Sequence, residues 1–389
     1  MRNFVSKKVQ SVKPSGIRRF FDIVSERKDV ISLGVGEPDF ITPWEIRDAG
    51  ISVIKKGYTQ YTSNSGLLSL RKEISSYLKE RFSVCFSESD IVITVGASEA
   101  IDITIRTIVE DGDEILVPDP SYVSYKPIIE ICGGKAVPVF CDGDNGFKLT
   151  AENLEKVITP KTKAIIFPYP NNPTGGIMER EFIEKIIPII LKHDLLVISD
   201  EIYAELTYGQ KHCSIASFEQ LKDRVVLISG FSKAFAMTGW RVGYVCAPTE
   251  IKEGLLKIHQ YGAICAPIFS QYAALSGLVQ GRKDGYSSVE LMRSEYDKRR
   301  KFMIKSFNDM GLTCFEPKGA FYVFPSVEST GMTGEEFATA LLNEKGVAVV
   351  RGDAFGEFGK YYVRCSYAYS MKNLVKAMEK IAEFVKNLK

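Results

Sequence analysis

Between residues 90 and 247, short apolar runs of strand length alternate with longer stretches whose apolar residues recur at helical spacing. The seven runs that predict strands are 91–95, 114–117, 136–140, 164–167, 195–199, 225–229 and 242–247. Strands that alternate with helices are joined by crossovers, so neighbouring strands run parallel. The pattern predicts an α/β fold, in which a mostly parallel sheet is covered by helices on both faces.

Three of the intervening stretches predict helices, at 98–110, 123–131 and 179–192. Ser98 is a candidate cap for the first helix, because a serine side chain can accept a hydrogen bond from a free N–H group of the first turn. Pro188 lies inside the third helix and lacks the N–H group that a helix uses. We therefore expect a kink at Pro188 or an earlier end of that helix.

The sequence changes in character after Ser270. A long helical pattern rich in arginine and lysine covers 289–310, and shorter strand-like and helix-like segments follow at 320–324, 334–343, 347–350, 361–366 and from 371 onward. These mixed elements predict a smaller α+β domain. The first forty or so residues are too few for a domain of their own. We expect a large domain at 45–285 and a small domain that combines 1–44 with 286–389.

Charge and composition narrow the class of protein. Lys and Arg number 50 and Asp and Glu 48, so the chain lacks the basic excess of proteins that bind nucleic acids or membrane surfaces. No apolar stretch has the length of a membrane span, and the N-terminus lacks the apolar core of a secretory signal. The eight cysteines are scattered without a CxxC pair and there are only three histidines. We expect a reduced, cytoplasmic protein without a metal site.

Polar residues follow several of the predicted strands, where open α/β sheets bind their ligands. Gly96, Ala97 and Ser98 come after the first strand and open a helix, whose free N–H groups and dipole suit a phosphate. Asn172 lies in a proline-rich turn after the fourth strand, where its amide can donate to an oxygen. Each cluster alone is also typical of an ordinary turn.

Asp200 and Tyr203 follow the fifth strand. A carboxylate in that place can pair with a pyridinium nitrogen, and the tyrosine hydroxyl three residues later can reach a substituent of the same ring. Tyr122 can stack on a planar ring, and the fork of Arg364 can hold a carboxylate with two hydrogen bonds. Taken singly, these residue types are more often caps, packing residues or surface residues.

The segment 232–244 contains Lys233 in a glycine-punctuated loop, with Arg241 eight residues later. A lysine that forms a Schiff base with an aldehyde must lose its proton and be shielded from water. Arginine suits the phosphate of a phosphorylated cofactor. The segment therefore predicts a pyridoxal 5′-phosphate (PLP) site. The joint pattern of a Gly turn, Asn, Asp, Tyr, Lys and two Arg is much more specific than any one of its members.

Over essentially its whole length, from the run 33–40 to the run 364–367, the chain resembles the class I and II aminotransferases of fold type I, the aspartate aminotransferase superfamily. The segment 232–244 resembles the lysine signature of that family. The resemblance implies that Lys233 is the Schiff-base lysine, that Asp200 pairs with the pyridine nitrogen and that Tyr122 stacks on the ring. It also implies that Tyr203 and Asn172 bond the ring hydroxyl.

The remaining roles that the resemblance implies concern the phosphate, the substrate and a second chain. The phosphate is held by Ala97, Ser98, Ser232 and Arg241. Tyr61 reaches the phosphate of the neighbouring subunit, which makes a homodimer the minimal unit. The substrate contacts are Gly36, Asn172 and Arg364 together with Ile17, and Ile17 and Tyr122 give the pocket an apolar wall. The resemblance implies small-molecule partners, an amino acid and a 2-oxo acid.

Two positions depart from frequent family patterns. Gly230 stands where many relatives have a serine that donates to the phosphate, so phosphate binding relies more on Ser232, Arg241 and the Gly96 loop. Ser98 stands where some aspartate-preferring relatives have a lysine, which weakens an assignment to aspartate alone.

Several alternatives stay open. A PLP-dependent C–S β-lyase on the same fold also keeps the lysine, aspartate and arginine, although the runs 16–19 and 36–39 are more similar to transaminases. A PLP-binding transcription regulator would need a DNA-binding domain, for which the chain has no spare segment. The runs 15–22, 199–208 and 257–261 resemble both the aromatic or broad-specificity aminotransferases and the N-acetyl-diaminopimelate aminotransferases. Both groups use the 2-oxoglutarate/glutamate couple.

Overall fold

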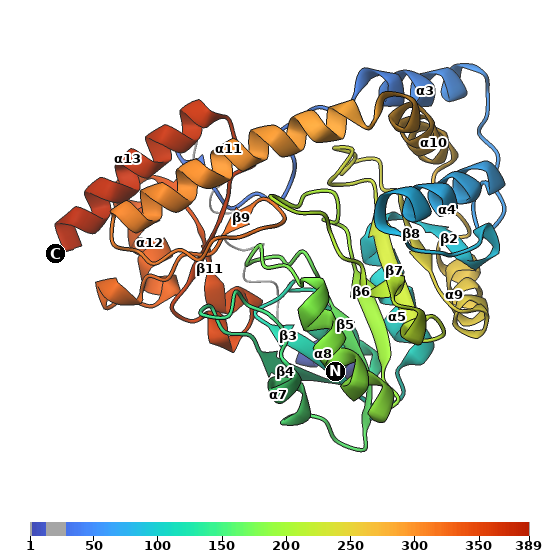
Figure 1. Ribbon diagram of the computed structural model, residues 1–389, viewed down its shortest axis with the longest axis horizontal. Coiled ribbons are helices and arrows are strands. Elements are labelled where there is room, and N and C mark those ends of the chain that lie inside the picture. Colours follow the sequence, from blue (N-terminus) through green and yellow to red (C-terminus); the bar gives the residue numbers. More distant parts are fainter. Residues whose placement is uncertain (1, 13–28, 389) are drawn as a thin grey trace.

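A seven-stranded sheet forms the centre of the molecule (Figure 1). The computed structural model describes residues 2–12 and 29–388. The strand order is β2-β8-β7-β6-β5-β3-β4, and β8 runs antiparallel to both of its neighbours while every other neighbouring pair is parallel. The strands are β2 (Ile91–Thr94), β3 (Glu114–Asp119), β4 (Lys135–Phe140), β5 (Thr162–Phe167), β6 (Leu196–Asp200), β7 (Val225–Gly230) and β8 (Gly243–Cys246). All seven predicted strands are confirmed, with shifts of no more than two residues at either end.

Helices cover both faces of this sheet, as predicted. On one face, α5 (Gly96–Ile108), α6 (Tyr125–Cys132) and α9 (Thr249–Gly262) share an apolar cluster with the strands. On the other face lie α7 (Ala151–Glu155) and α8 (Arg180–Lys192), followed by α3 (Trp44–Lys55), α4 (Leu68–Phe82) and α10 (Ile268–Asp284). Every residue of β2, β7 and β8 is buried, because strands covered on both faces need apolar residues in succession.

The expected cap at Ser98 was wrong, and of the two outcomes expected at Pro188 the earlier helix end was wrong. Helix α5 begins at Gly96 rather than at a Ser98 cap, because Gly96 takes up a positive φ of 78° that turns the chain directly into the helix. Ser98 consequently lies inside the first turn. Helix α8 continues through Pro188 to Lys192. Pro188 is on the exposed face of that helix, so water can satisfy the carbonyl that loses its N–H partner.

The C-terminal part forms a second core, built from α11 (Ser287–Asp309), α12 (Gly334–Lys345), α13 (Met371–Leu388) and short strands. The strands are β9 (Tyr322–Val323), β10 (Val347–Ala348), β11 (Val350–Arg351) and β12 (Val363–Ser366). Three of them form a sheet in the order β11-β12-β9. In Figure 1, α11 extends from beside α10 to beside α13 and so connects the two cores.

The N-terminal part adds to both regions. Helix α1 (Lys7–Ser11) lies against α6, and Lys8 forms an ion pair with Asp111 in the turn after α5. Strand β1 (Ile31–Ser32) pairs in parallel with β10. That pairing supports our proposal that residues before 45 belong with 286–389 and that 45–285 form the large domain. Among the described residues, no helix is long and apolar enough to cross a membrane.

Candidate active site

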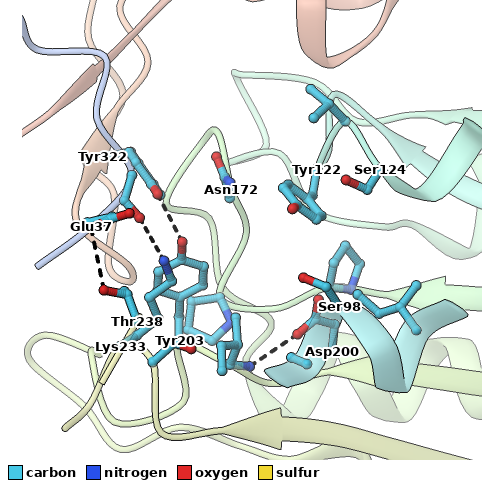
Figure 2. A pocket seen from close by; sticks show the side chains of 18 of the residues that line it. Glu37, Ser98, Tyr122, Ser124, Asn172, Asp200, Tyr203, Lys233, Thr238 and Tyr322 are labelled. Carbon is cyan, nitrogen blue, oxygen red and sulfur yellow. Dashed lines mark hydrogen bonds between the residues drawn. The ribbon is translucent and has the colours of Figure 1, made fainter. Parts of the chain in front are cut away.

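A cavity of about 740 Å³ lies beyond the carboxyl ends of the parallel strands, between the central sheet and the strands β9 and β12. Eleven of the predicted site residues line it: Gly36, Ala97, Ser98, Tyr122, Asn172, Asp200, Tyr203, Ser232, Lys233, Arg241 and Arg364. In the view of Figure 2, Lys233 and Tyr203 lie on one side of this cavity, and Ser98, Tyr122 and Asp200 on the other. The structure therefore brings together residues that are spread over more than 300 positions of the sequence.

One predicted residue does not line the cavity, and another lies outside the described residues. Tyr61 is 79% exposed and does not line it, so its predicted role depends on a second chain. Ile17 lies outside the described residues, as does the run 16–19.

Lys233 lies in the turn after β7, and its amine points into the cavity (Figure 2). The amine donates a hydrogen bond of 2.6 Å to the backbone oxygen of Gly36. Burial lowers the pKa of Lys233 to about 8; the carboxylate of Glu37 opposes this effect, and the guanidinium of Arg364 adds to it. A substantial fraction of the amine is therefore uncharged, and hence nucleophilic, close to neutral pH.

Asp200 is the last residue of β6 and is buried. Its carboxylate accepts a hydrogen bond of 2.7 Å from the Tyr125 hydroxyl and one of 3.2 Å from the backbone N–H of Ile202. Burial raises the pKa of Asp200 to about 6, and these two hydrogen bonds limit the rise. The group remains mostly ionised at neutral pH and supplies a buried negative charge to a cation in the cavity.

The N-terminus of α5 forms an anion-binding corner of the cavity. Position 96 favours glycine because its φ is 78°, a conformation that other residues rarely adopt; a Cβ there would also crowd the guanidinium of Arg241. Arg241 donates hydrogen bonds to the backbone oxygens of Thr238, at 2.9 Å, and Val95, at 3.3 Å, which fix its side chain beside the helix end. Ala97 and Ser98 belong to the first turn of α5, whose N–H groups lack partners within the helix. Together these groups suit a phosphate.

Arg364 lies in β12 and is buried. It donates a hydrogen bond of 2.8 Å to the side-chain oxygen of Asn172 and one of 2.6 Å to the backbone oxygen of Gly34. Its guanidinium lies over the rings of Tyr322, at 4.5 Å, and Phe355, at 4.8 Å. Its Nε has no hydrogen-bond partner within residues 2–12 and 29–388. A buried, incompletely paired guanidinium in a cavity is suited to bind a carboxylate.

Among the cavity residues that sequence reasoning missed are Glu37, Tyr125, Thr238 and Tyr322. Tyr125 is three positions after Tyr122 and resembles an ordinary apolar residue of its helix, so nothing in the sequence marks its bond to Asp200. Tyr322 lies in a strand that was predicted without a function. The run 320–324 is apolar throughout and buried throughout, so its pattern does not reveal what Tyr322 faces.

Gly230 now has a physical explanation. A Cβ at this position would lie 2.8 Å from the Cα of Gly243 on the neighbouring strand β8, which is backbone and cannot give way. A serine at position 230 would therefore push β7 and β8 apart. Close packing of the two strands excludes the phosphate donor that many relatives have there.

The fold and this cavity are those of a PLP-dependent enzyme. The chain belongs to the aminotransferase class I and II family, whose model matches residues 28–381. It is therefore an aminotransferase, and the members of its family depend on PLP.

Three relatives show the range of this family. An "Aspartate aminotransferase" of Pyrococcus abyssi is 43% identical over 99% of each chain. A "Probable N-acetyl-LL-diaminopimelate aminotransferase" of Bacillus subtilis is also 43% identical, over 99% of this chain and 96% of the relative. The crystal structure of an aromatic aminotransferase from Pyrococcus horikoshii superposes with a TM-score of 0.90, at 42% identity over 95% of this chain and 99% of the other. The chain is about equally similar to proteins of three different named specificities, so sequence identity does not distinguish between these substrates.

The residues present fit PLP. The corner formed by the N-terminus of α5 and Arg241 matches its phosphate. Asp200 matches the pyridine nitrogen and Lys233 matches the aldehyde. These groups occur in one cavity, which is large enough for the cofactor and a small substrate together.

The lowered pKa of Lys233 gives a testable pH dependence in the cofactor-free protein. Because folding lowers this pKa from 10.5 to about 8, the uncharged and reactive form is present at lower pH than for an ordinary lysine. We expect the rate of acetylation of Lys233 by acetic anhydride, followed by mass spectrometry, to rise with a midpoint near pH 8. The exposed Lys257 serves as the internal reference. A midpoint for Lys233 above pH 10 would contradict the proposed environment.

Proposed function

We propose that this aminotransferase transfers an amino group from an L-amino acid to a 2-oxo acid, with 2-oxoglutarate and glutamate as one couple. The observation that carries the proposal is the combination of an amine with a pKa near 8, a buried ionised carboxylate and an incompletely paired arginine in one cavity. Transamination needs each of these groups: a base at the α-carbon, a charge that stabilises a protonated ring nitrogen, and a holder for the α-carboxylate.

Each residue has a defined task in this proposal. When bound, PLP supplies an aldehyde that takes up the amino group and a ring that delocalises the electron pair released at the α-carbon. With its buried charge, Asp200 would favour a proton on the ring nitrogen. Lys233 would hold the aldehyde, and its amine would move a proton at the substrate α-carbon. The guanidinium of Arg364 orients the α-carboxylate, and Tyr203 donates to the ring oxygen.

A panel of amino donors with 2-oxoglutarate as acceptor tests the proposal. The panel contains phenylalanine, aspartate and N-acetyl-diaminopimelate, the donor classes to which the chain is similar. Tyr122 gives the cavity an apolar wall, so we expect phenylalanine to exceed aspartate in kcat/KM. An enzyme specific for N-acetyl-diaminopimelate would turn over neither of the other two.

The kinetic mechanism separates the alternatives. We expect ping-pong kinetics, with parallel double-reciprocal lines, because the first keto acid leaves before the second binds to the same cavity. Converging lines would contradict this mechanism. Release of pyruvate and ammonia from cystathionine without a keto-acid acceptor would instead identify a C–S β-lyase.

We also propose a cytoplasmic homodimer with shared active sites. The exposed Tyr61 is the residue that supports it, because its predicted partner is the phosphate held by another chain. Sedimentation should therefore give the mass of a dimer. The variant Tyr61→Phe should raise the dissociation constant of PLP about tenfold, since it loses one hydrogen bond to a charged group. Tyr361→Phe, a partly exposed tyrosine outside the cavity, is the control. A fully active monomer would contradict the shared site.

A further inference from the structure

Tyr322 lines the cavity but has no task in the proposed reaction. It is 1% exposed and lines the cavity beside Tyr203 and Arg364. Its hydroxyl lies 2.9 Å from the hydroxyl of Tyr203, and its ring lies 4.5 Å from the guanidinium of Arg364 (Figure 2 shows the pair of hydroxyls). One side chain therefore contacts both the proposed donor to the cofactor and the proposed holder of the substrate.

The contact with Arg364 is built into the backbone. Strands β9 and β12 pair antiparallel, with Tyr322 opposite Ser366. Arg364 is two residues before Ser366 and so lies on the same face of the sheet as Tyr322, as its diagonal neighbour. A guanidinium above the face of a tyrosine ring is attracted by the electrons of the ring, and this attraction keeps it over that face. The register of this strand pair thus sets the place of the guanidinium.

The contact with Tyr203 depends on one proton. Only one hydrogen can lie between the two hydroxyl oxygens, and within residues 2–12 and 29–388 the Tyr322 hydroxyl has no other hydrogen-bond partner. Burial raises the pKa of Tyr203, and the neighbouring Tyr322 raises it further, so both hydroxyls stay protonated. If Tyr322 donates to Tyr203, the O–H of Tyr203 is free to point into the cavity.

We propose that Tyr322 is a positioning residue with two separable tasks. Its ring holds Arg364 in the orientation that receives the substrate carboxylate. Its hydroxyl donates to Tyr203, so that Tyr203 donates in turn to the ring oxygen of bound PLP. Hydrogen bonds in such a chain polarise and strengthen one another. This inference rests on the proposed roles of Tyr203 and Arg364.

The variant Tyr322→Phe tests the hydroxyl alone, because it keeps the ring. Donation to the ring oxygen stabilises the deprotonated form of the lysine-bound cofactor. Weaker donation should therefore raise the pKa that a spectrophotometric titration of the PLP-loaded protein reports, by about half a unit to one unit. The KM for 2-oxoglutarate should stay within about twofold of the wild type, because the ring still contacts Arg364.

The variant Tyr322→Leu tests the ring. Loss of the cation–π contact should raise the KM for 2-oxoglutarate by about tenfold relative to Tyr322→Phe. The control is Tyr367→Phe, which removes a buried hydroxyl of the same core that donates to the backbone oxygen of Ala320 and neighbours Tyr208, away from Tyr203 and Arg364. It should change neither the spectroscopic pKa nor this KM. Since the phenylalanine variant is nearly isosteric, the hydroxyl test holds even if the leucine variant fails to fold.

Two results would overturn the inference: an unchanged spectroscopic pKa in Tyr322→Phe, or an unchanged KM in a folded Tyr322→Leu. The variant Tyr203→Phe distinguishes this failure from a failure of the proposed function. If Tyr203→Phe raises the spectroscopic pKa and Tyr322→Phe does not, only the role of Tyr322 is wrong. If the wild type transfers no amino group to 2-oxoglutarate, the proposed function itself is wrong.

Discussion

Replacing Lys233 by alanine should lower the rate of amino transfer by about four orders of magnitude or more, because one amine serves both as covalent anchor and as proton carrier. The visible absorbance band of lysine-bound PLP should disappear at the same time. The two effects have separate causes, so both measurements are needed: steady-state turnover with glutamate as donor, and the absorbance spectrum of the protein after incubation with PLP.

The fold should survive this replacement. The side chain of Lys233 makes one hydrogen bond, to the backbone oxygen of Gly36, and removing a buried amine also removes its cost of desolvation. Circular dichroism should therefore match the wild type. Lys257→Ala, on the exposed face of α9, is the control and should keep full activity. Survival of the band or of turnover in Lys233→Ala would invalidate the entire assignment of the site.

Replacing Asp200 by asparagine should have opposite effects on activity and on stability. Turnover should fall by about 10²- to 10⁴-fold, since a neutral amide cannot stabilise a protonated ring nitrogen. The cofactor-free protein should become more stable at neutral pH, because the wild type buries an ionised carboxylate with a raised pKa.

The sign of the stability effect follows from the pKa of Asp200. Folding raises that pKa from 3.8 to about 6, so the folded state favours the protonated form. Ionised Asp200 therefore costs about 3 kcal/mol above pH 6, and the cost vanishes as the pH falls to about 4. Urea denaturation of the cofactor-free proteins should show the variant more stable at pH 7.5 by up to this amount, and equal near pH 4. A variant less stable than the wild type at pH 7.5 would contradict the raised pKa.

Much of the fold was predictable because its signals are local. Strands of the central sheet are apolar over their whole length, and the glycines and prolines between them mark their ends. The helix ends were less predictable. Glu99 accepts a hydrogen bond from the backbone N–H of Val95, so the start of α5 is stabilised from within the helix and has no need of the Ser98 side chain. Nor does the sequence tell on which side of α8 Pro188 lies, which decides whether the helix can tolerate it.

Site residues that belong to one short sequence motif could be predicted. Site residues whose contacts depend on the pairing of segments far apart in the sequence could not. Lys233 and Arg241 share one loop, and Asp200 and Tyr203 share another. Tyr322 gains its contacts only through the register of β9 and β12, together with a strand end more than a hundred residues away. Tyr61 can be judged only with a second chain present. The contacts of Tyr322 and Tyr61 cannot be predicted for one reason. The sequence pattern indicates which residues share a face of a strand, but not which elements become neighbours.

The contact between Gly230 and Gly243 continues into the helix end, since a Cβ on Gly243 would lie 2.6 Å from the backbone nitrogen of Ala97 and the backbone carbon of Gly96. Three separate stretches of backbone thus touch without side chains between them. For enzyme engineering, this means that few substitutions are possible on the side of the pocket proposed to bind phosphate. A larger residue at one of these glycines would require the backbone of the other two segments to move. Libraries aimed at new donors should keep these glycines fixed and vary other lining residues of the cavity, such as Glu37, Val123 and Ser124.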